Sequence, residues 1–572
     1  MKKDNNFTLY PLKIMSLVLI IIIIFSIIPT RIISASPLTY IPLDNWVYPE
    51  ISRLETLRAF EGNDSVATNT LPLTRIEIAY LIDTVLSNLQ KGKLKLNHQN
   101  LSLIDKLVNE FQDELSTLGL NIVKLNKTTM ILDNLKLTLK INPYFTQKVD
   151  LFYPKLTQNK DTNKLYSFSE LGAVLSGSFS ENSAFYLDAS VYSAYSAYAE
   201  FELISTIPVK GIPFQAQIKQ AYIKLKLPSF EIPTPTNNPI FPSLSGIEFS
   251  DQDLLVGRDY MKWGPGYQGS LMLSDNSPAF DMLKYSGTID LNDFGGSFSK
   301  ASFTKFFSLL DQDTFFLGQR LEFKPRSNII IGLSETDIIS QDSSILFFNP
   351  LPFIPPYYVI WLIARMFEPQ EVNYNVGLDM EINLEQRVKL YGEWMVDDII
   401  FSPWRNPFPN RTAFLVGAYF ADHLGSGNTD FRIEYTHINN YVYFPRSSWQ
   451  NYLHQGEYIG HPLGPDADQL YLELTHNLSD RLNLSLSYTH ERHGEGQTGI
   501  PLPSDPMIAN EDIFLSGIIE KQQAYQAQLS YTISPQWEIS AGITRENIKN
   551  KDNNIGIDEK NTYFQIELEF QW

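Results

Sequence analysis

Apolar and polar residues alternate along most of the chain, from about Leu135 to the last residue. The end of the chain shows this best: Phe564, Ile566, Leu568, Phe570 and Trp572 alternate with Gln565, Glu567, Glu569 and Gln571. Further copies lie at 135–141, 374–382, 470–474, 482–488 and 537–543. A period of two residues predicts β-strands with one apolar and one polar face. Each strand covers roughly 9–11 residues, the length that crosses a bilayer at a tilt.

Alternation alone fits two architectures, a soluble β-sandwich and a transmembrane β-barrel. The alternating region is much longer than a typical sandwich domain, whereas a closed barrel accommodates many strands without leaving edges. The sequence therefore favours a mainly β fold, a transmembrane antiparallel β-barrel. At ~24 residues per strand the barrel has about 18 strands. With an even number of strands, the first strand begins and the last strand ends on the periplasmic side.

Aromatic residues near the strand ends suit the interfacial girdles of such a barrel. In the last strand, Phe564, Phe570 and Trp572 are predicted to act as the barrel-insertion signal. Their expected partners are outer-membrane lipid and the barrel assembly machinery.

From Asp44 to about Gly119 the hydrophobic period is helical instead. Thr74, followed three residues later by Glu77, predicts an N-cap with a capping box. The clearest apolar face belongs to a third predicted helix, with Ile104, Leu107, Val108, Phe111, Leu115 and Leu118 at spacings of three and four. The expected organisation is a signal peptide at 1–35, a small α-helical periplasmic domain at 36–125 and an outer-membrane barrel at 126–572.

The first 35 residues predict a secretory signal peptide. Lys2 and Lys3 precede an unbroken apolar run at 17–25, and Ser34-Ala35 offers a small-residue cleavage site. An uncleaved membrane anchor is the alternative, although the apolar stretch is shorter than the ~20 residues of a spanning helix. Farther along, the apolar segment 345–364 contains several prolines, which predicts a loop able to fold into the bore.

Composition narrows the function classes. The absence of cysteine excludes disulfides, thiolate metal sites, cysteine nucleophiles and an N-terminal lipidated cysteine. The formal charge of −19 argues against a nucleic-acid partner, because phosphate binding depends on Lys and Arg. The polar strand faces give the lumen an acidic lining, expected to be wet: Glu381, Glu393, Glu434, Glu473, Glu567 and Glu569.

Long segments rich in Pro, Gly and aromatic residues separate the strands, at 228–242, 345–369, 402–410, 441–468 and 494–511. In a barrel of this type the long loops face outward and the short turns face the periplasm. All of these segments are therefore expected at the outer end.

Two sets of residues resemble known families. Residues 42–48, with Ile51, Leu54, Leu57 and 73–79, resemble half of an S-layer-homology-like helical module. Residues 257–267, 273–281 and 460–468 are similar to the capsule assembly protein Wzi family, and the resemblance follows essentially the whole mature chain in order.

The Wzi resemblance implies an outer-membrane barrel of about eighteen strands with a periplasmic helical domain. It implies a lectin-like, non-enzymatic role in attaching or organising capsular polysaccharide. The S-layer-like pattern implies peptidoglycan as a further partner.

Two regions hold candidate polysaccharide-binding residues. In the central motif they are Arg258, Asp259, Tyr260, Trp263, Tyr267, Asp275 and Asn276, whose rings can stack on sugars and whose polar groups can bond to hydroxyls. In the late loop they are Arg446, Trp449, Tyr452 and His461. The alternative is structural, because Gly264-Pro265-Gly266 is turn chemistry and loop aromatics often pack on one another.

No catalytic residue, cofactor or metal is predicted. Asp466 and Asp468 alone offer few oxygen ligands for Ca²⁺. The run His490-Glu491-Arg492-His493 lacks the spacing of an HExxH zinc site. A Gly-x-Ser-x-Gly nucleophile elbow is absent from the sequence.

The leading hypothesis is a non-enzymatic outer-membrane protein that binds or organises capsular or other extracellular polysaccharide at the cell surface. The rival is an outer-membrane porin tethered to the cell wall by its helical module, which differs in having an open bore. A third hypothesis is an outer-membrane hydrolase, whose spatial triad a sequence alone does not reveal.

Overall fold

A computed structural model describes most of the chain outside its first 35 residues. The described residues are 36–63, 66, 68–119, 138–156, 164–196, 207–208, 215–233, 246–292, 300–310, 314–340, 372–385, 387–398, 410–422, 428–443, 451–496, 507, 513–534 and 536–571. The predicted signal peptide, the apolar segment 345–364 and Trp572 lie outside them. So do the candidate residues Arg446 and Trp449.

The described chain forms a closed antiparallel barrel of 18 long strands, as the alternation predicts. They are β2 (Thr138–Leu156), β3 (Lys164–Ser178), β4 (Ser183–Ser196), β6 (Gln215–Lys226), β8 (Gly246–Asp259), β10 (Phe280–Asn292), β11 (Lys300–Leu309), β12 (Thr314–Arg326), β13 (Ile329–Ser340), β14 (Val372–Glu385), β15 (Val388–Asp398), β16 (Arg411–Phe420), β17 (Thr429–Ile438), β20 (Ala467–Ser479), β21 (Leu482–His493), β22 (Glu520–Ser534), β23 (Trp537–Lys549) and β24 (Glu559–Gln571). The first and last of these pair with each other, with Tyr144 opposite Gln571, and this pairing closes the barrel.

Short elements complete the chain. The pairs β1 (Thr70–Leu71) with β9 (Lys262–Trp263) and β18 (Leu453–His454) with β19 (Glu457–Tyr458) lie outside the barrel sheet. The strands β5 (Ile207–Pro208) and β7 (Phe230–Pro233) pair with β6 and β8, and the 3-10 helix η4 (Lys551–Asn553) lies between β23 and β24.

The two faces of the barrel wall differ as in a membrane protein. Large apolar side chains are exposed on the outside, including Val256 at 56%, Val416 at 52% and Ile566 at 55%. A soluble sandwich would bury this face, so its exposure rules that alternative out. Phe564 belongs to the exposed face, whereas Phe570 is covered by Trp537 at a ring distance of 4.8 Å.

In the described part of the chain, four helices precede the barrel: α2 (Val47–Thr56), α3 (Arg75–Gln90), α4 (His98–Glu110) and α5 (Gln112–Thr117). The predicted capping box is present at the start of α3, where Thr74 and Glu77 bond reciprocally. The single helix expected over 104–118 is instead two, because the backbone leaves helical geometry at Phe111. None of the helices in the described part of the chain is long and apolar enough to cross a membrane.

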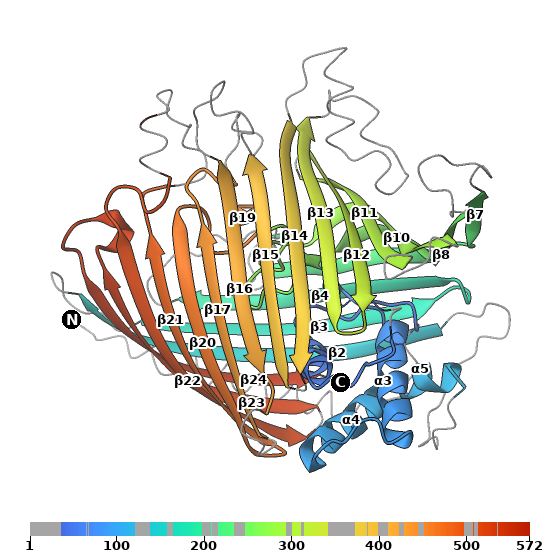
Figure 1. Ribbon diagram of the computed structural model, residues 1–572. Helices are drawn as coiled ribbons and strands as arrows, with labels where there is room; N and C mark the ends of the chain where they lie inside the picture. Colours follow the sequence, from blue (N-terminus) through green and yellow to red (C-terminus); the bar gives the residue numbers. More distant parts are fainter. Residues whose placement is uncertain are drawn as a thin grey trace.

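The described residues 36–119, which we call the helical module, share a core made of Val47, Ile51, Leu54, Ile78, Leu81, Ile82, Ile104, Leu107, Phe111 and Leu115. Figure 1 shows these helices gathered at the end of the barrel toward which the β14 arrow points. At that end the N–H of Arg387, in the β14–β15 turn, donates to the carbonyl of Thr56 at 2.9 Å. The module therefore sits against the short turns.

One expected outward loop lies at the wrong end. The strands run alternately in opposite directions, so the β6–β8 connection falls at the same end as the β3–β4 turn. Its first residues confirm this, because the N–H of Lys226 donates to the carbonyl of Asn182 in that turn at 2.8 Å. For the described residues 228–233, the prediction that 228–242 faces outward is therefore wrong. The number of strands that precede a connection decides the end at which it lies, whereas its length and proline content do not.

Replacing Val416 by Lys should reduce the stability of the inserted barrel. A cation on the lipid face costs about 2–4 kcal/mol near the bilayer midplane and less near the interfaces. Urea unfolding of the protein refolded into lipid vesicles measures the change. The control is Gln528→Lys, on the half-buried inner face of β22. Equal stability of the two variants would contradict the assignment of the faces.

The paired replacement Phe570→Ala with Trp572→Ala should block insertion, because the last strand then loses the aromatic residues at its end, and with Phe570 the ring that packs on Trp537 of the neighbouring strand. The measurement is the amount of heat-modifiable protein in the outer-membrane fraction. Tyr531→Ala, an exposed aromatic on β22, serves as the control. Normal insertion of the double variant would overturn the insertion signal.

Candidate functional site

The connection between β8 and β10, residues 260–279, folds into the barrel and is called the first lumen segment. Its apolar residues Met261, Trp263, Leu271, Met272 and Leu273 are at most 4% exposed. They share a core with inward side chains of the wall; for example, the Trp263 and Phe306 rings lie 5.4 Å apart. The motif that identifies the family resemblance therefore fills the lumen.

Two glutamates on the barrel wall hold this segment through its backbone. The carboxylate of Glu393, on β15, accepts the N–H groups of Gly266 at 2.8 Å and Leu271 at 2.7 Å. That of Glu434, on β17, accepts those of Tyr267 at 2.7 Å and Gln268 at 2.9 Å. These four hydrogen bonds satisfy amides that no strand pairs, and a buried amide left without an acceptor would cost ~1–3 kcal/mol.

The glycines of the motif follow from this contact. Gly264 has φ +117°, and a Cβ there would stand 2.4 Å from a carboxylate oxygen of Glu393. A Cβ at Gly266 would stand 2.0 Å from the carbonyl oxygen of Gly269. The turn can approach the carboxylate only because these positions lack side chains.

A second connection covers the first from the outer side. The second lumen segment joins β17 to β20 and is described at 439–443 and 451–466. Its Tyr443 and Tyr452 rings stack 5.4 Å apart. Their hydroxyls donate to consecutive carbonyls of the first segment, Leu271 at 2.7 Å and Met272 at 2.6 Å. The two segments are thus one packed unit.

His461 is part of this unit and is fully buried. Its Nδ1 accepts the N–H of Leu463 at 3.1 Å. Burial, and then the positive charge of Lys262, lower the pKa of His461 to about 3. The ring is therefore neutral at physiological pH and serves packing.

The helical module holds the first lumen segment from the opposite side. Thr70 and Leu71 pair with Trp263 and Lys262, and the N–H of Gly264 donates to the carbonyl of Asn69 at 3.0 Å. Arg320, buried on β12, donates to Thr70 at 2.8 Å and to Asp379 at 2.9 Å. Wall, module and motif therefore meet at one buried network.

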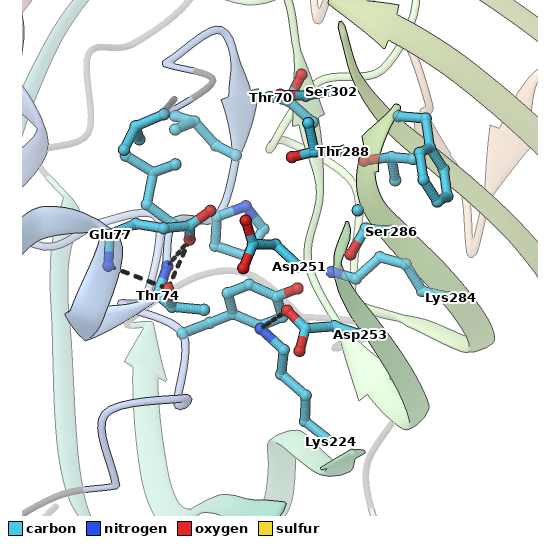
Figure 2. A pocket seen from close by; sticks show the side chains of 18 of the residues that line it. Thr70, Thr74, Glu77, Lys224, Asp251, Asp253, Lys284, Ser286, Thr288 and Ser302 are labelled. Carbon is cyan, nitrogen blue, oxygen red and sulfur yellow. Dashed lines mark hydrogen bonds and ion pairs between the residues drawn. The ribbon is translucent and has the colours of Figure 1, made fainter. Parts of the chain in front are cut away.

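A cavity of about 420 Å³ lies between the module and the wall (Figure 2). Lys224 on β6 forms an ion pair of 2.9 Å with Asp253, opposite the Thr74–Glu77 cap of α3. The ammonium groups of Lys224 and Lys284 lie 4.1 and 4.2 Å from the Tyr40 ring. These cation–π contacts bind the start of the module inside the barrel.

The structure separates the predicted site residues. Successive side chains of a strand point to opposite faces. Arg258 accordingly pairs with Asp281 at the exposed surface, at 2.8 and 2.6 Å. Asp259 is buried inside, bonded to Gln220 at 2.7 Å and Lys284 at 3.3 Å. These two residues do not share one binding surface.

Other candidates divide between the interior and the surface. Trp263, Tyr452 and His461 are buried, so solvent does not reach them in this arrangement. Asp275 is exposed and Tyr260 and Asn276 are partly so. Tyr267 is 39% exposed inside the lumen, where the guanidinium of Arg432 lies 3.8 Å from its ring.

The expectation of a wet acidic lining is wrong for three of its six residues. Glu381, Glu393 and Glu434 are at most 6% exposed. The first pairs with Lys389 at 2.9 Å, and the other two bind the first lumen segment. Alternation shows which residues face inward, but it does not show what occupies the space.

Sequence reasoning missed the residues that join module to wall. Arg320, Lys389 and Asp430 bind Thr70, Glu55 and Arg53 of the module. A usable signal was present, since Arg320, Glu322 and Lys324 place charges at every second position of one strand. Several charged side chains on the inner face of one strand require oppositely charged or hydrogen-bonding partners inside the barrel.

The described residues contain no group of three or more His, Cys, Asp or Glu side chains placed to hold a metal. Asp468 instead pairs with Arg492 at 2.9 Å, and Asp466 accepts from the Ser516 hydroxyl at 2.6 Å.

The fold and this packing define an outer-membrane β-barrel with an occupied lumen. The family model of the capsule assembly protein Wzi matches residues 243–340 and 367–563, just over half of the chain. The chain belongs to this family and localises to the outer membrane. No curated protein sequence matches it.

A solved structure of a family member shows the same fold. This is the Escherichia coli Wzi structure, described as an outer membrane protein involved in group 1 capsule assembly and a carbohydrate-binding β-barrel. It is 14% identical, with a TM-score of 0.52 over 92% of this chain and 98% of that one. The match to the Pseudomonas aeruginosa OccD3 structure, at 11% identity, covers 75% of this chain and 91% of that one, with a TM-score of 0.37.

Replacing Glu393 by Ala should release the first lumen segment, because the buried N–H groups of Gly266 and Leu271 lose their acceptor. At ~1–3 kcal/mol for each unsatisfied group, the free energy of unfolding should fall by about 2 kcal/mol or more. Urea unfolding measures this loss, and planar-bilayer recording should show larger current steps than the unmodified protein. Glu538→Ala, at an exposed position of β23, is the control. Unchanged stability and unchanged current in Glu393→Ala would show that the carboxylate does not hold the segment.

Proposed function

We propose that this protein binds capsular or other extracellular polysaccharide at the outer end of the barrel and helps attach or organise it at the cell surface. Membership of the Wzi family supports the proposal, and so does the similar Escherichia coli structure, described as carbohydrate-binding. The observation that carries it is the occupied lumen: two connections that fold inward form a rigid surface at the outer end.

That outer surface comprises Asp275, Asn276, Gln455, Glu457 and Tyr458, and we call it the hairpin surface. The Asn276 amide donates to the carbonyl of Tyr458 at 2.7 Å, which joins the two lumen segments. Asp275 lies 3.5 Å from the ammonium of Lys262 and keeps 40% of its side chain exposed. Carboxylate, amide and aromatic groups on a fixed backbone suit the hydroxyls and faces of sugar rings.

Two predicted residues extend this surface in sequence. Arg446 and Trp449 belong to the same β17–β20 connection as the hairpin. In the proposal Trp449 stacks on a sugar and Arg446 binds an acidic group, which offsets repulsion between an acidic protein and an acidic polymer.

The rival functions lose their main support from the same packing. A wide porin bore would need the space that Trp263, Leu271 and Tyr452 fill. A hydrolase would need an accessible acid–base pair, whereas His461 is buried and bonded to a backbone amide. The proposed role is therefore non-enzymatic.

The helical module is proposed to form the periplasmic part of the protein. It lies at the end of the barrel that carries the short turns, where β2 begins and β24 ends. Contact with peptidoglycan follows only from the S-layer-homology-like pattern. The module, expected over 36–125, would then place the barrel close to the cell wall.

Loss of the gene should release polysaccharide into the medium without lowering its total synthesis. The measurement compares cell-bound and released polysaccharide in the deletion strain and in a strain with the gene restored. Unchanged retention in the deletion strain would count against the proposal.

Within the restored strain, Trp449→Ala with Asn276→Ala should lower retention several-fold while the barrel inserts normally. The matched control is Ile555→Ala, a 78% exposed residue in the β23–β24 connection, which also lies at the outer end. Equal loss in both variants would indicate a general surface effect in place of binding.

A further inference from the structure

The lumen is packed on one side only. Against the lumen segments, inward residues of β15 and β16 such as Met395, Ala413 and Leu415 have no exposed area. Across the barrel, inward residues of β21, β22, β24 and β2 are half-buried along their length: Ser485, Ser487, Thr489, Gln522, Gln526, Gln528, Gln565, Glu567, Glu569, Asn142, Thr146 and Lys148. Polar side chains left partly exposed inside a barrel are in contact with water.

A cavity of about 810 Å³ follows this second side. Inward residues of β2 line it from Lys140 to Asp150. These two residues are ten positions apart, and at about 3.3 Å per residue the lining extends for about 33 Å along the strand. At the usual tilt of about 40° this is about 25 Å along the barrel axis, the height of the apolar band of an outer-membrane barrel.

The two ends of the cavity lie toward the two ends of the barrel. On the module side, Gln536 and Gln571 line it at the rim, together with module residues such as Trp46. Toward the outer end, Asp150 and Tyr166 line it. The described part of the β21–β22 connection packs on β17, where the Phe514 and His437 ring centroids lie 4.0 Å apart, and not over this cavity.

The lining of this cavity is predominantly acidic. It contains seven carboxylates, Asp44, Glu110, Asp150, Glu170, Asp188, Glu567 and Glu569, against four cations, Arg75, Lys140, Lys148 and Lys219. Two of the cations are already paired, Lys219 with Glu170 at 2.7 Å and Arg75 with Glu110 at 2.9 Å. Acidic side chains along a narrow pore attract cations and exclude anions.

We infer that the barrel contains a narrow, water-filled side passage along β24, β2 and β3, between the wall and the packed lumen segments, that conducts small hydrated cations. The passage does not depend on polysaccharide binding, which uses the opposite, packed side and its outer surface. It gives the protein a second activity, leakage of inorganic cations past the module.

The absence of cysteine from the chain makes a direct test available. Thr146→Cys places one thiol in the passage with little change of volume, and Ala413→Cys places one in the packed side. In planar bilayers, a charged methanethiosulfonate reagent should lower the current of Thr146→Cys when added from either side. It should leave Ala413→Cys unchanged. Reaction from one side only, or from neither, overturns a through passage.

The charge of the lining is tested by selectivity. Under a KCl gradient, the reversal potential of the unmodified protein should have the sign expected when K⁺ permeates more readily than Cl⁻. Glu567→Lys with Glu569→Lys should shift it toward Cl⁻, whereas Glu61→Lys, on the exposed surface of the module, should not. No current above that of bare lipid, or a shift equal in both variants, refutes the inference. Polysaccharide retention is measured separately on cells. A negative bilayer recording would therefore refute the passage without contradicting polysaccharide binding, and unchanged retention in the deletion strain would contradict binding without refuting the passage.

Discussion

The interior of this protein depends on two carboxylates that accept backbone amides. Glu393 and Glu434 are withdrawn from water by the barrel wall, and a buried carboxyl group is tolerated only when hydrogen-bond partners surround it. The first lumen segment supplies four N–H groups, and it can do so only where glycine lets the backbone approach. Once the segment is fixed, Tyr443 and Tyr452 have carbonyls to bind, and the second segment has a surface to cover.

The sequence was sufficient for the architecture. Period-two alternation predicted the barrel and its lipid-facing side, and the Thr74–Glu77 pair predicted the start of α3, because both patterns act locally. It was insufficient for the interior. Glu393 looks the same in sequence whether water or a backbone amide stands opposite, and the partner lies 122 residues away at Leu271. The end at which the β6–β8 connection begins depends on the number of strands before it, which no local pattern records.

The candidate binding residues are separated because their surroundings, like those of Glu393, are set by residues distant in the sequence. The central motif was predicted to hold candidate binding residues, with a structural role as the alternative. Strand geometry places the Arg258 side chain outside and that of Asp259 inside, and packing encloses Trp263. Part of what makes the motif recognisable is therefore architecture. The residues left for recognition stand on the outer surface of a scaffold made rigid from within, which is consistent with binding a polymer at a membrane surface.

The pairing of β1 with β9 ties the N-terminal part of the chain to the middle of the barrel. Thr70 and Leu71 meet their partners inside the closed wall, so the module and the first lumen segment share backbone hydrogen bonds in addition to side-chain contacts. A change in the path of either backbone would leave amides and carbonyls of the other without partners. An exchange of the module between relatives therefore has to preserve this short pairing.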